Sequence, residues 1–106
     1  FPYYISKLWA DPSRIEQINR RLDSMDNMTV EKMKSVQLDQ TSPFAQEVLP
    51  FIWLTETGEE TGNLKRAYEF LKVWDGVEDV DSEAALIFHA TMRNLVLNLY
   101  GDELAL

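Results

Sequence analysis

The chain has 106 residues, of which 45% are hydrophobic and 26% are charged, so its composition is that of a globular domain and not of a disordered segment. Its formal net charge of -8 argues against a nucleic-acid or anionic-membrane surface, because both attract positive charge. The chain contains no cysteine, which excludes a disulfide framework and a thiolate metal site.

The beginning of the chain predicts an extended segment followed by a helix. Residues 1–10 are rich in aromatic and β-prone side chains, so we expect an extended lead-in there and a single helical region over residues 11–106. Asp11 can cap a first helix from about Pro12 to Leu22, because proline fits the first helical position. The apolar residues of this helix recur at helical spacing and are expected to face inward: Ile15, Ile18 and Leu22.

Arg14 lies in the first turn of this predicted helix. The helix macrodipole favours anions there, so an exposed guanidinium is disfavoured by a few tenths of a kcal/mol. We therefore expect a group outside the helix to bind Arg14. The alternative is a surface arginine that pairs with Asp11 or with another acid.

Two shorter helices are expected in the middle of the chain. Thr29 is a good N-cap for a helix through about Val36, and Ser42-Pro43 supplies a cap and a first helical residue for the next one. Between them, Gln37 and Asp39 are more consistent with a structural role, in which they hydrogen-bond exposed backbone groups, than with chemistry. The third helix has an apolar stripe of Phe44, Val48, Leu49, Ile52 and Trp53.

The last two helices are predicted from about Asn63 to Trp74 and from Asp81 or Ser82 to about Gly101. The first has an apolar stripe of Leu64, Ala67, Tyr68, Leu71 and Trp74, and Asp75-Gly76 ends it with a glycine suited to a left-handed turn. The second is expected to turn Ala85, Phe88, Met92, Leu95, Val96 and Leu99 inward. The fold class is therefore all-α, with about five helices in an orthogonal or irregular bundle.

Other candidate sites are weak. His89 is the only histidine, with Asn94 and Asp81 as its nearest plausible partners in the sequence. We expect a core or boundary residue, because a lone histidine in an apolar helix more often has that role than the role of a base. No serine stands in a G-x-S-x-G motif, so a Ser-His-Asp triad has no support. The acidic run from Asp75 to Glu83 lacks the glycine and the final glutamate of a calcium loop. The tryptophans at helical spacing are expected to act as core anchors: Trp9, Trp53 and Trp74.

Four motifs in the same order resemble a segment of the β-chain of penicillin acylases (penicillin amidases), which are N-terminal-nucleophile hydrolases. The motifs are Leu8-Trp9 with Arg14-Ile15, Ile18 and Leu22; Thr29-Val30-Glu31; Val36-Gln37-Leu38-Asp39 with Ser42, Ala45 and Leu49-Pro50; and Trp74-Asp75-Gly76. The resemblance implies that the parent has a four-layer αββα architecture and that this fragment supplies helices that flank it.

The resemblance also implies a reaction and a site residue. It places Arg14 as the catalytic site residue, an arginine near the active site that helps to orient the catalytic asparagine and the substrate around the oxyanion. The family hydrolyses amides by acyl transfer to water through an acyl-enzyme, with the first residue of the β-chain as nucleophile. Because this chain begins with Phe1, we expect an internal segment that is not catalytic on its own.

Further expectations concern cofactors, partners and location. No cofactor or metal is expected in this fragment; the parent family often binds calcium, but residues 1–10 hold no carboxylate that could supply a ligand. The expected partners are the remainder of the parent hydrolase, with its catalytic sheet and α-chain, and a small-molecule amide substrate, but no nucleic acid and no membrane. Weak self-association through uncovered apolar residues near Phe1 and a periplasmic or secreted location are also expected. The alternative function is an independent acidic helical module for protein binding or scaffolding.

Overall fold

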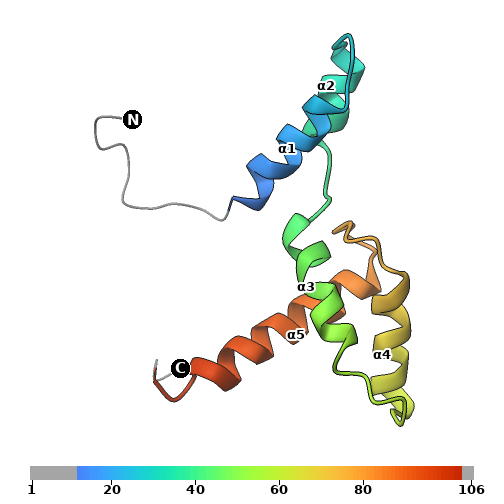
Figure 1. Cartoon of the computed structure of the whole chain (residues 1–106), viewed down its shortest axis with the longest axis vertical. Coiled ribbons are helices and arrows are strands. Elements are labelled where there is room, and N and C mark those ends of the chain that lie inside the picture. Colours follow the sequence, from blue (N-terminus) through green and yellow to red (C-terminus); the bar gives the residue numbers. More distant parts are fainter. Residues whose placement is uncertain (1–11, 104–106) are drawn as a thin grey trace. The chain divides into compact units, whose positions relative to one another are not determined.

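The computed structural model describes residues 12–103, so the predicted lead-in over residues 1–10 and the Asp11 cap lie outside the described range. Within it the chain forms five helices (Figure 1): α1 (Ser13–Asp23), α2 (Val30–Gln37), α3 (Pro43–Trp53), α4 (Gly62–Val73) and α5 (Glu83–Tyr100). The described residues contain no strand, only an isolated bridge between Thr41 and Val77. The prediction of an all-α fold is confirmed.

The chain divides into two compact units after Asp39. The described part of the first unit, residues 12–39, consists of α1 and α2 and is called the helix pair. The described part of the second, residues 40–103, consists of α3, α4 and α5 and is called the three-helix unit. None of the five described helices combines the length and the apolar character that crossing a bilayer requires.

Three helices begin at the hydroxyl caps that the sequence predicts. The side-chain oxygens of Thr29, Ser42 and Ser82 each accept a hydrogen bond from the backbone N–H three residues later, at 3.2 to 3.3 Å. Each bond satisfies one of the N–H groups that a helix N-terminus leaves without an internal partner. Of the two caps proposed for α5, Ser82 is therefore the one used.

In the helix pair, the predicted inward face of α1 is partly wrong. Ile15 is 54% exposed, whereas Gln17 is only 7% exposed. Ile18 and Leu22 are half-buried, and Val36 of α2 is buried. The most buried residue of α1 is thus polar, and the apolar residues Ile18 and Leu22 are covered only in part.

The core of the three-helix unit is built around Phe88 of α5, which is fully buried. It clusters with four other buried residues from all three helices: Ala45, Leu49, Leu71 and Ala84. The Phe88 ring centroid lies 5.4 Å from that of Trp74 and 6.1 Å from that of Phe44, which are distances typical of interacting aromatic pairs. Trp74 also donates a hydrogen bond from Nε1 to the carbonyl of Val77, at 2.8 Å.

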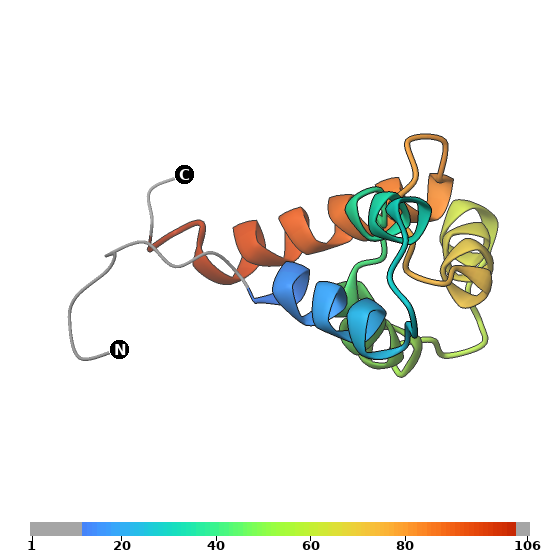
Figure 2. The same cartoon turned by 90° about the horizontal axis from the view of Figure 1, so that it is seen from above.

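The predicted inward residues at the C-terminal end of α5 are wrong. Leu95, Val96 and Leu99 are 47–57% exposed. With 18 residues α5 spans about 27 Å, whereas α3 and α4, with 11 and 12 residues, span about 17–18 Å each. The last turns of α5 therefore extend past both partners (Figures 1 and 2). Leu64 and Trp53, also expected inside, are likewise exposed.

The loop between α3 and α4 is organised by the Glu60 carboxylate. Its Oε1 accepts hydrogen bonds from the backbone N–H of Thr57 at 2.6 Å and from the Thr57 hydroxyl at 2.9 Å, and Oε2 accepts one from the N–H of Gly58 at 2.8 Å. These bonds, the backbone N–H of Thr57 first, lower the pKa of Glu60 from 4.5 to about 2. Because the folded pKa is depressed, the stabilisation is present above pH 4.5 and is lost as the pH falls toward 2.

A glycine joins the segment after α4 to the start of α3. Gly76 has a φ of +84° and is buried. Its carbonyl accepts a hydrogen bond from the N–H of Ser42 at 2.8 Å, and the side-chain amide of Gln46 donates to the carbonyl of Asp75 at 2.9 Å. A Cβ on Gly76 would lie 2.8 Å from Cγ of Gln46. The position therefore requires glycine for both its backbone angle and its packing.

We expect Gly76→Ala to destabilise the three-helix unit by more than the roughly 1–2 kcal/mol that a left-handed backbone angle costs an L-residue. The matched control is Gly58→Ala, because Gly58 has the same φ of +84° but nothing within 4 Å of the added Cβ. Chemical denaturation of both variants separates the two contributions, since the control reports backbone strain alone. Equal losses for the two variants would show that the contact with Gln46 has no energetic weight.

Candidate functional site

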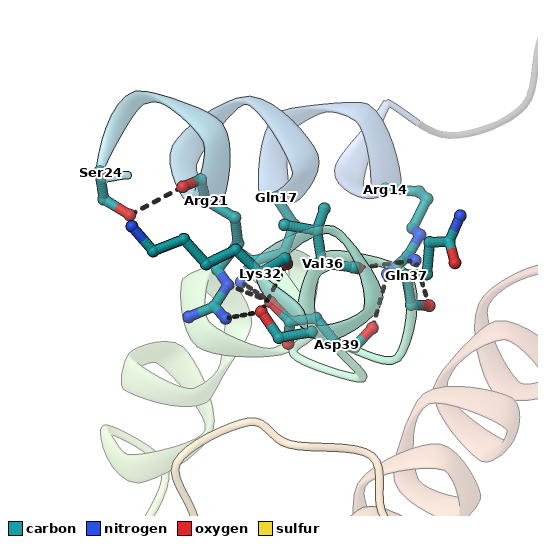
Figure 3. A network of polar contacts seen from close by, with 9 residues as sticks. Arg14, Gln17, Arg21, Ser24, Lys32, Val36, Gln37 and Asp39 are labelled. Carbon is teal, nitrogen blue, oxygen red and sulfur yellow. Dashed lines mark hydrogen bonds and ion pairs between the residues drawn. The ribbon is translucent and has the colours of Figure 1, made fainter. Parts of the chain in front are cut away.

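The candidate site is the polar interface between α1 and the C-terminal end of α2 (Figure 3). Arg14, Gln17 and Arg21 are spaced three and four residues apart, so they project from one face of α1. The other side of the interface is the last turn of α2 together with Asp39, which lies two residues beyond that helix. All the contacts of this interface therefore lie within the helix pair.

Arg14 donates to three backbone carbonyls, two in the last turn of α2 and one two residues beyond it. Its Nη1 lies 2.6 Å from the carbonyl oxygen of Asp39, and its Nη2 lies 3.1 Å from that of Gln37 and 3.4 Å from that of Val36. The last carbonyls of a helix have no internal partner and form the negative end of its dipole, so a cation is favourable there. Among the described residues, these backbone carbonyls are thus the hydrogen-bond acceptors outside α1 that bind Arg14.

Asp39 connects the same two elements through its side chain. Oδ2 of Asp39 accepts a hydrogen bond from Nε2 of Gln17 at 2.7 Å and lies 3.4 Å from Nε of Arg21. The Asp39 side chain is only 12% exposed, so these contacts replace most of its hydration. Arg21 also donates from Nη2 to the hydroxyl of Ser35 in α2, at 3.2 Å. The carboxylate therefore has one hydrogen-bond donor and one ion-pair partner from α1, while the backbone carbonyl of Asp39 accepts from Arg14.

The structural role expected for Gln37 and Asp39 takes different forms at the two residues. Gln37 contributes its backbone carbonyl, and its side chain points away from Asp39 in Figure 3. The side-chain partners of Asp39 given above come from α1. Sequence reasoning missed Gln17 and Arg21, because they look like the ordinary polar face of an amphipathic helix. Their only sequence signal is the seven-residue spacing from Arg14 to Arg21.

His89 lies elsewhere, on α5 in the three-helix unit. Its Nε2 is 3.3 Å from Oε1 of Glu78, both side chains are substantially exposed, and its ring stacks edge-on against Phe88. Its described ion-pair partner is thus Glu78 and neither Asn94 nor Asp81, and Asn94 instead donates to the carbonyl of Ala90 at 2.8 Å. An exposed pair of this kind contributes little to stability and forms no catalytic constellation.

Two acidic side chains of the run from Asp75 to Glu83 accept hydrogen bonds from backbone N–H groups of their own loop. Asp75 and Asp79 each accept a hydrogen bond from the backbone N–H two residues later, at 3.0 and 3.1 Å. Such short-range bonds are typical of turns. Among residues 12–103, no group of three or more acidic or histidine side chains is arranged to hold a metal ion.

Comparison with known proteins gives one family. The model of the family described as penicillin amidase matches residues 1–105. No solved structure matches the chain. The matched range includes all four motifs noted in the sequence and the whole of the interface between α1 and α2.

Proposed function

Because the chain belongs to the penicillin amidase family, we propose that it is the helical part of a hydrolase that cleaves small-molecule amides through an acyl-enzyme. The family match over nearly the whole chain is the observation that carries this proposal. In the reaction, a nucleophile attacks the amide carbonyl, the C–N bond breaks and the amine leaves with a proton; water then releases the carboxylic acid. The nucleophile, its base and the oxyanion donors come from the remainder of the hydrolase.

Within this proposal, Arg14 orients polar groups around the oxyanion. Its contacts with α2 support that role, since three carbonyl bonds fix a planar and permanently charged guanidinium in one orientation. A guanidinium has five N–H groups. The three bonds use three of them, and the side chain is exposed, so the other two can serve an acceptor outside the helix pair. Preorganised donors of this kind stabilise charge that develops in a transition state.

The location and partners follow from the same proposal. The remainder of the hydrolase, including a catalytic sheet and an α-chain, is the proposed partner, and the periplasm or the exterior of the cell is the proposed location. Any calcium in the assembled enzyme would be bound by that remainder.

The test is amide turnover by the full-length gene product compared with turnover by this chain alone. A panel of chromogenic amides with aromatic, aliphatic and glutaryl acyl groups covers the acyl classes that the proposal allows. We expect the full-length product to hydrolyse at least one of them with a burst of amine in the first turnover, which is the kinetic signature of an acyl-enzyme. The chain alone is expected to give a helical circular dichroism spectrum and no turnover.

Two outcomes would overturn the proposal. Turnover by the 106-residue chain alone would show that the segment contains its own nucleophile. A correctly folded full-length product that hydrolyses no amide of the panel would instead favour the acidic binding module.

A further inference from the structure

We infer that Asp39 is a positioning residue for Arg14, and that Gln17 and Arg21 hold it in place. This inference rests on the active-site role proposed for Arg14. It concerns how the helix pair fixes the orientation of the guanidinium. It is tested by substituting side chains that do not themselves bond to Arg14.

The first observation is that Asp39 is held at two points. Its carbonyl oxygen makes the shortest of the three bonds to Arg14, at 2.6 Å. Its carboxylate accepts from Gln17 at 2.7 Å and pairs with Arg21 at 3.4 Å. Asp39 lies beyond the end of α2, and its backbone N–H donates to the carbonyl of Val36 at 3.4 Å. The side-chain contacts tie Asp39 to the same helix that carries Arg14, and so keep its carbonyl within reach of the guanidinium.

The second observation is the burial of Gln17. Gln17 is 7% exposed and is the one buried polar residue among those that the structure describes. The buried apolar residue of the helix pair is Val36. An amide at a buried position gains little net stability over an apolar side chain, because its hydrogen bond only offsets lost hydration. What the amide adds is direction, since its N–H must meet the Asp39 carboxylate. Gln17 therefore sets the geometry of the interface more than its stability.

The third observation concerns charge. Nε of Arg21 lies 3.4 Å from the same Asp39 oxygen that accepts from Gln17, so the carboxylate has one hydrogen-bond donor and one ion-pair partner. Arg14 bonds to the backbone carbonyl of the same residue. Arg21 thus provides a cation for the carboxylate while Arg14 bonds to the carbonyl. Without this division, Arg14 could rotate onto the Asp39 carboxylate and leave the carbonyls.

The experiment exchanges the amide and the carboxylate across the interface in the full-length hydrolase. Asp39→Asn removes the charge that Arg21 contacts, and Gln17→Glu places two carboxylates against each other. The double variant restores an amide–carboxylate bond with its polarity reversed, and both exchanges preserve side-chain size. The carboxylate introduced by Gln17→Glu would also lie four residues before Arg21 on the same helix, the favourable order for an ion pair. Glu16→Gln, an exposed acid of α1, is the matched control.

We expect each single variant to lower kcat by about tenfold to a hundredfold, the range that follows from a displacement of a catalytic group by roughly 1 Å, with KM little changed. The double variant is expected to regain most of the lost kcat, as coupled neighbours do in a double-mutant cycle. The control should leave kcat unchanged. Circular dichroism confirms that each variant is folded at the assay temperature.

A second measurement does not depend on activity. In the 106-residue chain, hydrogen exchange of the Arg14 guanidinium protons reports its three carbonyl bonds directly by NMR. We expect both single variants to accelerate this exchange and the double variant to slow it again. A single variant with faster exchange of the Arg14 guanidinium protons and an unchanged melting temperature would show that the substituted side chain positions Arg14 without contributing to stability.

The outcomes distinguish this inference from the proposed function. If Arg14→Lys lowers kcat but both single variants of Asp39 and Gln17 leave it unchanged, the positioning role is wrong and the proposed function stands. If the single variants lower kcat but the double variant regains none of it, the positioning role is also wrong. If Arg14→Lys itself leaves kcat unchanged, the active-site role of Arg14 fails, whatever the exchange data show.

Discussion

Arg14→Lys is expected to lower kcat of the full-length hydrolase by roughly a hundredfold or more, which corresponds to the loss of about 2.7–4 kcal/mol of transition-state stabilisation. Lysine keeps the positive charge but loses the planar set of donors, so it cannot bond to the carbonyls of Val36, Gln37 and Asp39 and to an active-site acceptor at the same time. Steady-state kinetics with the best amide of the panel measures the effect. Arg20→Lys, an exposed arginine on the same helix, is the matched control.

The same variant is expected to have a small effect on folding. A lysine ammonium near the C-terminus of α2 retains a dipole interaction of about 0.3–1 kcal/mol. The melting temperature should therefore fall by only a few degrees while turnover nearly disappears. The opposite result, full activity with a clearly lower melting temperature, would return Arg14 to a purely structural role as the cap of α2.

Phe88→Ala is expected to cost the three-helix unit about 3–5 kcal/mol of unfolding free energy, which is the usual cost of removing a buried aromatic ring. Phe88 is fully buried, and its ring contacts those of Phe44 and Trp74, so its removal leaves a cavity between α5 and the segments on both sides. Since small domains unfold with about 5–15 kcal/mol, the loss takes a large share of the total. Urea denaturation followed by tryptophan fluorescence measures it.

Leu86→Ala is the matched control for Phe88→Ala, because Leu86 lies on the same helix but is largely exposed. It should cost well under 1 kcal/mol, as surface substitutions usually do. A loss at Phe88 no larger than the loss at Leu86 would mean that the packing around the ring contributes nothing to stability.

The parts of the fold that depend on short-range rules could be predicted from the sequence. Thr29, Ser42 and Ser82 cap their helices as expected, because a cap needs only a hydroxyl and an N–H three residues away. The left-handed angle of Gly76 after α4 follows from equally local chemistry. These rules determine where helices begin and end, which is why the all-α prediction succeeded.

Predictions about burial depended on partners that the sequence does not display. The apolar stripe of α5 was extended to Leu99, but α3 and α4 are too short to cover it, and no periodicity reports the length of a neighbouring helix. On α1, Ile15 is exposed and Gln17 is buried, and Gln17 donates a hydrogen bond to the Asp39 carboxylate beyond the end of α2. Hydrophobic pattern alone assumes an apolar partner and therefore selects the wrong face.

The candidate site was predictable only in part. An arginine against the helix dipole indicates that Arg14 has a partner outside its helix, and the structure provides one. The identity of that partner was out of reach, since its acceptors lie 22 to 25 residues further along the chain and are backbone atoms. Backbone acceptors leave no residue type to recognise. Gln17 and Arg21 were missed for a related reason, because only the position of Asp39 gives them a role.

The polar interface between α1 and α2 also fixes the register of the two helices. Apolar side chains pack acceptably after a shift of one turn, about 5.4 Å, because dispersion contacts have little direction. The same shift here would place Ile18 against the carbonyls at the end of α2 and remove the donor that Gln17 provides to Asp39. The bond between Gln17 and Asp39 is partly buried, so a carboxylate left without it would cost about 1–3 kcal/mol, which favours the present register over its neighbours. The helix pair thus resembles a coiled coil whose single polar layer specifies one alignment at some expense of stability.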